Sequence, residues 1–381
     1  MMYNILADEN IPFAKKAFSN FGTVQLAPGR EITNEILRSY DILIIRSVTK
    51  VNEQLLEGTN IKFVGTTTIG LDHIDTDYLQ KKHIGYANAP GCNADSVAEY
   101  IFAGLFDIAS DGKFRLQDKS LGILGYGNIG SRVAKIADTV GLKLYINDPP
   151  LQRKNGNSYF CSYEKAIEAD IITYHVPLNI GGVDNTYHML SSSQLNSFDS
   201  NKIILNASRG SVVSNNDLKI FLKNNSNKVI LDVWEDEPVI DKDLLKSVWI
   251  GTPHIAGYSL EGKVNGTVMI FNSLNWFLKE NKVWQPALPE IKDPVIDFPE
   301  SGSLEQSLHV LISKVYDIRK DDHKLRQIGI YDKNEAGGYF DSLRKNYPVR
   351  REFSNFTVSI NKKLQQEIKI LKSLRFKLRE Y

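Results

Sequence analysis

The sequence predicts an α/β protein built on doubly wound parallel sheets. Short β-rich runs alternate with helical patterns along almost all of the 381 residues, as at residues 4–7, 42–45 and 62–64. Alternation of this kind indicates βαβ units, whose strands lie parallel. From about Ser120 the alternation becomes regular enough to supply the successive strands of a complete doubly wound domain.

The regular block begins with a buried strand at residues 121–124, followed by a helix. The apolar residues that recur at helical spacing are Ile129, Val133, Ile136, Ala137 and Val140. The further candidate strands are residues 142–146, 171–174, 203–205, 229–233 and the run that enters Gly251. Longer helical patterns at residues 93–110 and 260–279 flank the block, and we interpret them as helices that bridge two domains.

The composition is that of an ordinary globular protein, with 42% hydrophobic and 24% charged residues. A net charge of +1 gives no general attraction to nucleic acid or to a membrane surface. Two distant cysteines, Cys92 and Cys161, cannot build a disulfide framework. Residues 1–10 lack the apolar core of a signal peptide, and the densest apolar run, residues 42–45, is too short to cross a bilayer. We therefore expect a cytoplasmic protein with neither a nucleic-acid nor a membrane partner.

The turn after the first strand of the block carries a glycine fingerprint at residues 125–130. Gly125 permits a tight turn, Gly127 lets the backbone approach a pyrophosphate, and Gly130 lets the helix pack closely on the strand. A lone motif of this kind is also compatible with a simple packing turn. Here a strand precedes it, a helix follows it, and Asp148 ends the next strand, which together predict a Rossmann domain. A carboxylate at this place binds ribose hydroxyls and repels a 2′-phosphate, so it favours NAD over NADP.

Three polar side chains follow later strands, at the edge where open α/β sheets bind ligands. Arg209 offers a planar fork of donors that matches a carboxylate. His254 is suited to accept a hydroxyl proton, and Glu237 could fix its tautomer. Considered one at a time, Arg209 could form a surface salt bridge, His254 could be a structural histidine, and Glu235 and Asp236 could form a solvated acidic turn. Their occurrence at successive strand ends of one nucleotide domain favours catalysis.

The order of these motifs resembles that of the D-isomer-specific 2-hydroxyacid dehydrogenases, over roughly residues 1–280. The motifs are the glycine fingerprint, Arg209-Gly210, residues 232–234 with Glu237-Pro238, and residues 253–256. The resemblance implies hydride transfer at C2 of a small 2-hydroxy acid with NAD. The histidines of the chain show no metal-ligand spacing, so no metal site is expected. It implies Arg209 as the substrate-orienting residue, His254 as the acid/base and Glu237 as its partner. The cofactor-binding residues that it implies are Gly125, Gly127, Asn128, Ile129, Gly130, Asp148, Val176, Ala207, Asp232 and Gly257.

A phosphorylated 2-hydroxy acid is the expected substrate, and we expect it to be bound by Ser47, Thr68 and Tyr258. Residues 45–52, 65–73 and 89–93 resemble a subfamily that acts on such a compound. Ser47 and Thr68 are hydroxyl residues in loops that follow buried strands, although a β-branched strand end would also explain residues 66–68. Another 2-hydroxy acid such as phosphoglycerate remains an alternative, as does a non-catalytic NAD sensor.

The C-terminal residues are expected to form an α+β dimerisation domain. Four prolines between residues 286 and 299 predict a linker. Beyond them we expect a helix at residues 303–316, a polar loop, a strand near residues 356–360 and a last helix at residues 364–374. So small a unit buries only a modest core alone, which favours a homodimer, and the subfamily resemblance agrees.

The C-terminal domain is also basic. Residues 305–381 hold 17 Lys and Arg against 10 Asp and Glu. These residues carry no recognisable nucleic-acid-binding motif. Arg344, Lys345, Arg350 and Arg351 surround one short turn, where they could steer an anionic substrate. The expected domains are therefore residues 1–98 with 258–284 as a discontinuous flavodoxin-like substrate domain, 99–257 as the NAD domain, and 285–381 as the dimerisation domain.

Overall fold

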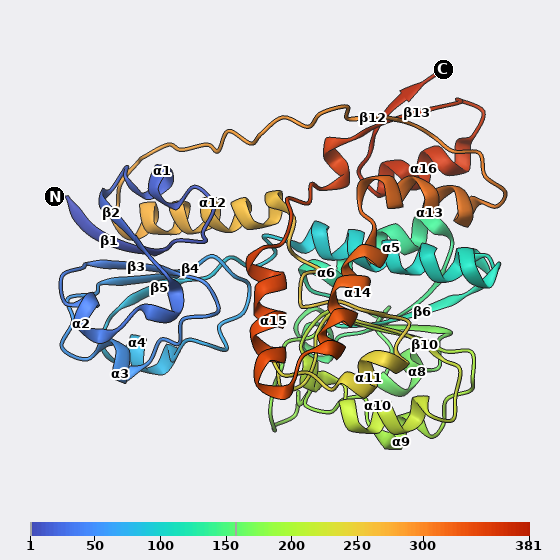
Figure 1. Cartoon of the computed structure of the whole chain (residues 1–381), viewed down its shortest axis with the longest axis horizontal. Coiled ribbons are helices and arrows are strands. Elements are labelled where there is room, and N and C mark those ends of the chain that lie inside the picture. The colour runs from blue at the N-terminus through green and yellow to red at the C-terminus, as the bar shows by residue number, and fades with distance from the viewer. Residues whose placement is uncertain (1, 157) are drawn as a thin grey trace. The chain divides into compact units, whose positions relative to one another are not determined.

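The computed structural model describes residues 2–156 and 158–381, and the chain divides into two compact units (Figure 1). The N-terminal unit comprises Met1–Asn93 and Ser259–Glu290. The nucleotide unit comprises Ala94–Tyr258 and Ile291–Tyr381. The domain boundaries expected from the sequence remain predictions.

The N-terminal unit is a parallel five-stranded sheet in the order β2-β1-β3-β4-β5. This is the flavodoxin-like order, so the predicted fold is confirmed. Its strands are β1 (Tyr3–Asp8), β2 (Gly22–Ala27), β3 (Ile42–Ile45), β4 (Phe63–Thr66) and β5 (Gly85–Ala87). Its helices are α1 (Ala14–Phe18), α2 (Asn34–Leu37), α3 (Glu53–Leu56), α4 (Thr76–Lys81) and α12 (Leu260–Phe277). The central strand β3 is apolar throughout because helices cover both faces of the sheet.

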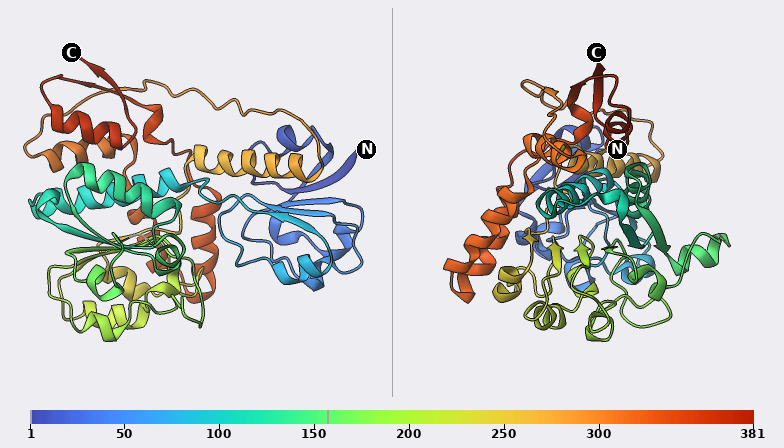
Figure 2. Two further views of the ribbon diagram at one scale, coloured as in Figure 1. Left: turned by 180° about the vertical axis from the view of Figure 1, so that it is seen from behind. Right: turned by 90° about the vertical axis from the view of Figure 1, so that its right-hand side faces the viewer.

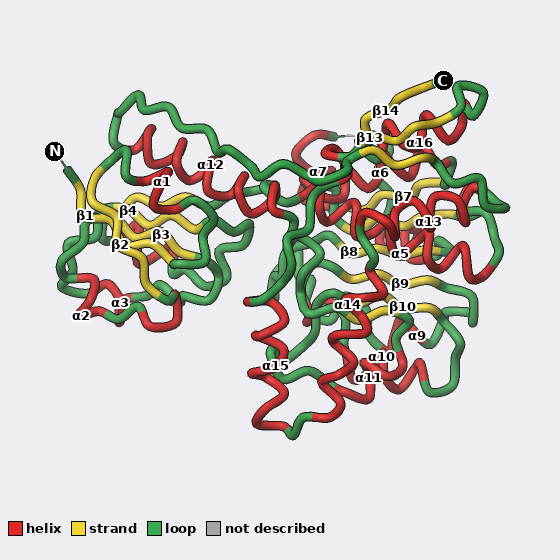
Figure 3. The backbone as a smooth tube through the Cα atoms, turned by 45° about the horizontal axis from the view of Figure 1, so that its top comes forward, coloured by secondary structure: helices red, strands yellow, loops and turns green. Residues whose placement is uncertain are grey.

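The nucleotide unit holds a parallel six-stranded sheet in the order β11-β10-β9-β8-β6-β7. Its strands are β6 (Ser120–Leu124), β7 (Lys143–Asn147), β8 (Ile171–Tyr174), β9 (Ile203–Asn206), β10 (Lys228–Leu231) and β11 (Ile250–Gly251). Figure 3 shows β8, β9 and β10 side by side. Every strand expected in this block is present, which confirms the doubly wound domain.

Helices cover both faces of this sheet. The core on one face includes side chains of α5 (Ala94–Gly112) and α6 (Asn128–Val140). The core on the other face includes side chains of the shorter helices α8 (Tyr163–Ile167), α9 (Ser192–Leu195), α10 (Asn215–Leu222) and α11 (Lys242–Ser247). Helix α7 (Pro149–Asn155) follows β7. Within the described residues, no helix combines the length and the apolar character that crossing a membrane requires.

The C-terminal residues 291–381 form helices and a parallel three-stranded sheet in the order β12-β13-β14. The strands are β12 (Val295–Asp297), β13 (Thr357–Ile360) and β14 (Lys377–Glu380). The helices are α13 (Leu304–Val315), α14 (Ile318–Arg326), α15 (Lys333–Lys345) and α16 (Gln365–Ser373). The α+β character is thus confirmed, as are the first helix, the strand and the last helix of the expected order.

Two expectations for this segment were wrong. The proline-rich stretch, expected to be only a linker, contains the edge strand β12, a position where neighbouring prolines are tolerated. The expected polar loop contains α14 and α15, whose first turns are capped by the Asp317 and Asp332 carboxylates. These helices have charged outer faces, so their apolar pattern is short and easily missed.

The C-terminal elements pack on the nucleotide-binding sheet of their own chain. Side chains of α13 and α16 share one core with α5 and α6, and Figure 2 shows these helices, orange and red, over the blue-green pair. Helix α14 runs along β11, where the Asp322 carboxylate accepts the Gly251 N–H at 2.8 Å. Phe340 of α15 enters the core on the other side of the sheet. The apolar face that we expected a twin subunit to cover is therefore covered within the chain, and the homodimer remains a prediction.

Candidate active site

The turn between β6 and α6 is shaped for close approach by a pyrophosphate. Gly125 has a φ of +93°, and a Cβ there would lie 2.7 Å from the His175 carbonyl oxygen. A Cβ on Gly130 would lie 2.0 Å from the Gly125 carbonyl oxygen. At Gly127 a Cβ would meet no atom of the described residues within 4 Å, its two chain neighbours aside, so the backbone is open to a ligand. Asn128 begins α6, whose N–H groups point toward this space. These residues fit a dinucleotide such as NAD.

Asp148 connects the end of β7 to this turn. One carboxylate oxygen accepts the Tyr126 N–H at 2.7 Å, and the other caps α7 by accepting the Leu151 N–H at 2.9 Å. The predicted cofactor ligand Val176 flanks the same turn, since its side chain lies 3.0 Å from the Cβ position of Gly125. Ala207 directly follows β9. The structure thus places these residues along one edge of the sheet, while their contacts with NAD remain predictions.

We expect Asp148→Asn to narrow the preference for NAD over NADP, because it removes the charge that repels a 2′-phosphate. The asparagine has no charge but keeps an oxygen that can cap α7, so this variant tests the effect of the charge without removing the cap. Asp148→Ala, which loses both, should narrow the preference at least as much and also lower stability. Ratios of kcat/KM for the two cofactors test this, and an unchanged ratio in both variants would show that Asp148 does not select the cofactor.

His254 and Glu237 form the hydrogen-bonded pair that the sequence predicts. His254 Nδ1 lies 2.8 Å from one Glu237 carboxylate oxygen, and the other oxygen accepts the Trp234 N–H at 2.9 Å. Burial alone would raise the pKa of Glu237, but His254, the Trp234 N–H and Arg344 together lower it below its ordinary value. Glu237 is therefore a carboxylate at neutral pH. It leaves Nε2 of His254 as the ring nitrogen available to a substrate.

Asp232 builds the turn that carries His254. The Asp232 carboxylate accepts the Thr252 hydroxyl at 2.6 Å and the backbone N–H groups of Ile255 and Ala256 at 2.7 and 2.9 Å. Its carbonyl accepts the His254 N–H, and His254 adopts a φ of 58°. Asp232 is only 1% exposed. The sequence suggested a cofactor ligand here, whereas the structure adds a positioning role that no local pattern revealed.

Arg209 follows β9, and the backbone after it lies directly against the segment that leads to Glu237. A Cβ on Gly210 would lie 1.9 Å from the Trp234 carbonyl oxygen, so only glycine permits this approach. The Arg209 guanidinium donates to the Ser208 carbonyl at 2.8 Å. Arg209, Glu237 and His254 thus follow three adjacent strands at the same edge of the sheet. Glu235 does not belong to a merely solvated turn, because it pairs with His188 at 2.6 Å.

Ser47 and Thr68 lie in the N-terminal unit, where they follow the adjacent strands β3 and β4. Ser47 is exposed. Thr68 Oγ1 lies 2.7 Å from Thr66 Oγ1. The nearby Arg46 is engaged by the buried Asp8 carboxylate at 3.0 Å. The two residues of this unit that we expect to bind the substrate therefore lie at one edge of the sheet. Their roles remain predictions.

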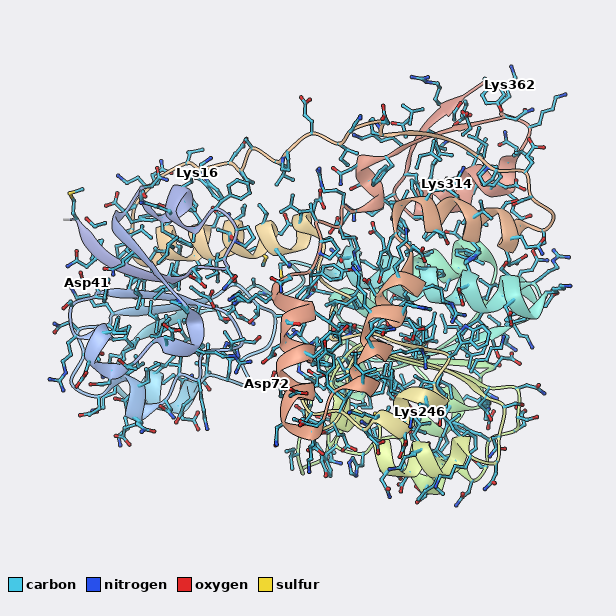
Figure 4. The ribbon with its side chains drawn as sticks, viewed as in Figure 1. Lys16, Asp41, Asp72, Lys246, Lys314 and Lys362 are labelled. Atoms are coloured by element: carbon cyan, nitrogen blue, oxygen red, sulfur yellow. The ribbon has the colours of Figure 1, made fainter. Side chains whose placement is uncertain are left out.

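The basic residues expected to form one steering cluster at residues 344–351 are separated. Arg350 is buried and donates to the Ala256 carbonyl at 2.6 Å, so it cannot attract a ligand from solution. Arg351 donates to Asn355 at 3.1 Å. Other basic side chains of the segment, such as Lys314 and Lys362, lie on its outside (Figure 4). Arg344 instead approaches Tyr258, with its guanidinium carbon 5.8 Å from the ring centroid.

The stability of the nucleotide unit is expected to depend on His175, which follows β8. Its Nε2 lies 3.0 Å from the Thr173 hydroxyl, and its buried Nδ1 has no hydrogen-bond partner among the described residues. Burial lowers the pKa of His175 from 6.5 to about 3. Between these values the unfolded chain binds a proton that the folded chain does not bind. The stabilisation is thus complete above pH 6.5 and is lost as the pH falls toward about 3.

We therefore expect the unfolding free energy of the His175→Gln variant to fall less than that of the unchanged chain when the pH is lowered. Urea unfolding of both proteins at about pH 7 and about pH 5 measures this difference. Equal falls in the two proteins would contradict the assignment of a neutral, buried His175.

Comparison with known proteins identifies two regions of the chain. Residues 102–256 match the D-isomer specific 2-hydroxyacid dehydrogenase NAD binding domain. Residues 288–374 match a domain of unknown function, DUF3410. Among solved structures, the chain resembles an NAD-bound 3-phosphoglycerate dehydrogenase from Entamoeba histolytica, with a TM-score of 0.63 and 23% identity over 73% of this chain and 96% of the other. A D-lactate dehydrogenase from Aquifex aeolicus has a TM-score of 0.60 and 25% identity over 72% of this chain and 95% of the other.

Relatives of similar length resemble nearly the whole chain. Erythronate-4-phosphate dehydrogenase from Photorhabdus laumondii is 44% identical over 372 residues, 96% of each chain. The enzyme of that name from Proteus mirabilis is 42% identical over 359 residues, 93% of this chain and 94% of the other. These matches confirm the family that the motifs predicted, together with its NAD cofactor. This NAD-dependent oxidoreductase therefore belongs to the erythronate-4-phosphate dehydrogenases, within the D-isomer-specific 2-hydroxyacid dehydrogenases.

Proposed function

We propose that this chain oxidises 4-phospho-D-erythronate to (3R)-3-hydroxy-2-oxo-4-phosphooxybutanoate, a step in pyridoxal 5′-phosphate biosynthesis in the cytoplasm. The 2.8 Å contact between His254 and Glu237, beside Arg209 at the same sheet edge, is the observation that carries the proposal. Relatives that share 96% of their length with this chain bear the name of this activity.

Each residue of the candidate active site has a separate role in the proposed reaction. Arg209 binds the substrate carboxylate and stabilises the oxygen on C2 as it becomes a carbonyl. His254 accepts the proton of the C2 hydroxyl through Nε2, and Glu237 stabilises the resulting imidazolium. Bound NAD supplies the acceptor for the hydride that leaves C2. Asp232 holds the 252–256 turn, and with it His254, in place for the proton transfer.

A substrate panel with the purified chain and NAD tests the proposal by the absorbance of NADH. We expect the highest kcat/KM with 4-phospho-D-erythronate, and lower values with 3-phospho-D-glycerate, D-erythronate and D-lactate. A higher value with 3-phospho-D-glycerate would assign the alternative substrate. No NADH with any 2-hydroxy acid would instead support a sensor that binds NAD without turnover.

We further propose that the chain acts as a homodimer that associates through residues 300–381. Exposed apolar side chains on this segment support an interface, since Val310, Ile330 and Val349 are 37%, 78% and 71% exposed. Light scattering of the whole chain at micromolar concentration should give twice the 43.0 kDa mass of one chain. A mass of one chain would exclude the dimer under these conditions.

A further inference from the structure

His73 is a polar side chain of the N-terminal unit that contacts the end of β4. Its Nε2 lies 3.1 Å from the Thr66 hydroxyl oxygen, and that oxygen lies 2.7 Å from the Thr68 hydroxyl oxygen. Thr66 is the last residue of β4 and is fully buried, whereas Thr68 is half-buried. The three side chains therefore form a chain of hydrogen bonds that leads from His73 to Thr68, which we expect to bind the substrate.

Backbone contacts hold both ends of this chain of hydrogen bonds. The His73 carbonyl accepts the Val51 N–H at 2.8 Å, and the Val51 carbonyl accepts the Asp75 N–H at 2.8 Å. At the other end, the Thr68 carbonyl accepts the Ala89 N–H at 3.0 Å. Because the backbone is anchored at these places, the three side chains can keep their contacts with little further loss of conformational freedom.

The single proton of the Thr66 hydroxyl gives the chain of hydrogen bonds a direction. Thr66 can donate to only one of its two partners, and it must accept from the other. If Thr66 donates to His73, Thr68 must donate to Thr66, and the Thr68 proton is used within the chain. If Nε2 of His73 carries a proton and donates it, Thr66 donates to Thr68, and the Thr68 proton remains for a ligand. The proton on Nε2 therefore decides what Thr68 offers to a ligand.

An anionic substrate requires a donor at Thr68. Among the described residues, Thr66 is the one hydrogen-bond partner of the Thr68 hydroxyl, so a second bond from Thr68 can go to a ligand. Oxygens of a carboxylate or a phosphate accept hydrogen bonds, and a hydroxyl that presented only its lone pairs would repel them. Hydrogen bonds in series also polarise one another, so the Nε2–H donor strengthens the bond that Thr68 donates.

We propose that His73 is a positioning residue for the substrate: its Nε2–H, acting through Thr66, sets the Thr68 hydroxyl as a donor to an anionic oxygen of the bound 2-hydroxy acid. That Thr68 binds the substrate rests on the proposed function. His73 itself needs no contact with the substrate. Within the described part of the chain, no cluster of side chains that could hold a metal ion includes His73, so this role competes with no metal site.

The first test breaks the chain of hydrogen bonds at one link at a time and measures KM and kcat separately. Thr66→Val keeps the shape of the side chain and removes the hydroxyl, whereas His73→Leu removes the donor. For both variants we expect KM for 4-phospho-D-erythronate to rise roughly 3- to 10-fold and kcat to change less than about twofold, as for one lost hydrogen bond. The double variant should show no further rise, because either change breaks the same chain. An unchanged KM, or losses that add, would overturn the proposal.

A rescue variant and a matched control separate the donated proton from simple loss of structure. His73→Gln should keep KM within about twofold of the unchanged chain, because an amide N–H can replace Nε2–H. A rise as large as in His73→Leu would show that the donated proton has no role. Thr67→Val is the control, since Thr67 is equally buried but its hydroxyl lies 3.4 Å from the Ile45 carbonyl, outside the chain of hydrogen bonds. An equal rise of KM in this control would also overturn the proposal.

Proton–nitrogen NMR of the histidine side chains separates this proposal from the proposed function. The His73 signals, identified by their absence in His73→Gln, should show a proton on Nε2 in the NAD-loaded chain at neutral pH. This measurement requires no turnover, so it stands even if another 2-hydroxy acid proves to be the substrate, and the KM comparison is then made with that acid. An Nε2 without a proton would overturn the proposal even if the chain oxidises 4-phospho-D-erythronate.

Discussion

Replacing His254 with alanine is expected to lower kcat by ~10²–10⁴-fold while leaving the affinity for NAD unchanged. The imidazole is the group placed to take the hydroxyl proton, with Glu237 2.8 Å from Nδ1. No cofactor contact is assigned to this side chain, so NAD binding should persist. Stopped-flow kinetics and NAD titration by fluorescence measure the two quantities separately.

A second histidine–carboxylate pair supplies the control for this experiment. His188 lies 2.6 Å from Glu235 in the same unit, but neither residue is assigned a part in the reaction. His188→Ala should therefore cost far less turnover than His254→Ala. Glu237→Gln should also cost less than His254→Ala, since an amide still accepts from Nδ1 but no longer stabilises the imidazolium. Near-normal turnover in His254→Ala would refute the assigned proton acceptor.

The largest effect on stability is expected from Phe340→Ala, which should lower the unfolding free energy by ~3–5 kcal/mol. Phe340 is fully buried on α15, in the core that also contains side chains of α10 and α11. Removing its ring leaves a cavity that rigid neighbours fill only in part.

Urea unfolding followed by tryptophan fluorescence measures the change. Val183→Ala is the matched control, since Val183 belongs to the same unit, is 88% exposed and lies outside the proposed dimer interface, and it should change stability by no more than ~0.5 kcal/mol. A loss in Phe340→Ala no larger than in the control would mean that α15 does not depend on this core.

Much of the fold follows from local patterns in the sequence. The apolar runs at residues 121–124 and 203–205 predict their strands because strands buried on both faces are largely apolar. The glycine fingerprint predicts the turn before α6, since each glycine meets a separate steric requirement. The pair of His254 and Glu237 was predictable because both residues follow neighbouring strands of one parallel sheet.

Features that depend on distant contacts were not predictable in this way. Asp232 accepts hydrogen bonds from residues 20 or more positions later, and its sequence neighbourhood gives no sign of them. Arg344 looked like one of several surface charges, because only the fold separates it from the buried Arg350. Helix α14 was missed because few of its residues are apolar and its partners lie far away in the sequence, at β11 and α11.

The packing of α13 and α16 on α5 and α6 has a consequence for biosynthesis. The ribosome completes α5 and α6 by residue 140, whereas the helices that cover them end at residues 315 and 373. The chain therefore emerges with the outer sides of α5 and α6 partly uncovered until α16 has been synthesised. Such a nascent chain exposes apolar surface and is a natural client for a chaperone. We therefore expect deletion of α16 to cause more aggregation during synthesis than deletion of the first strands.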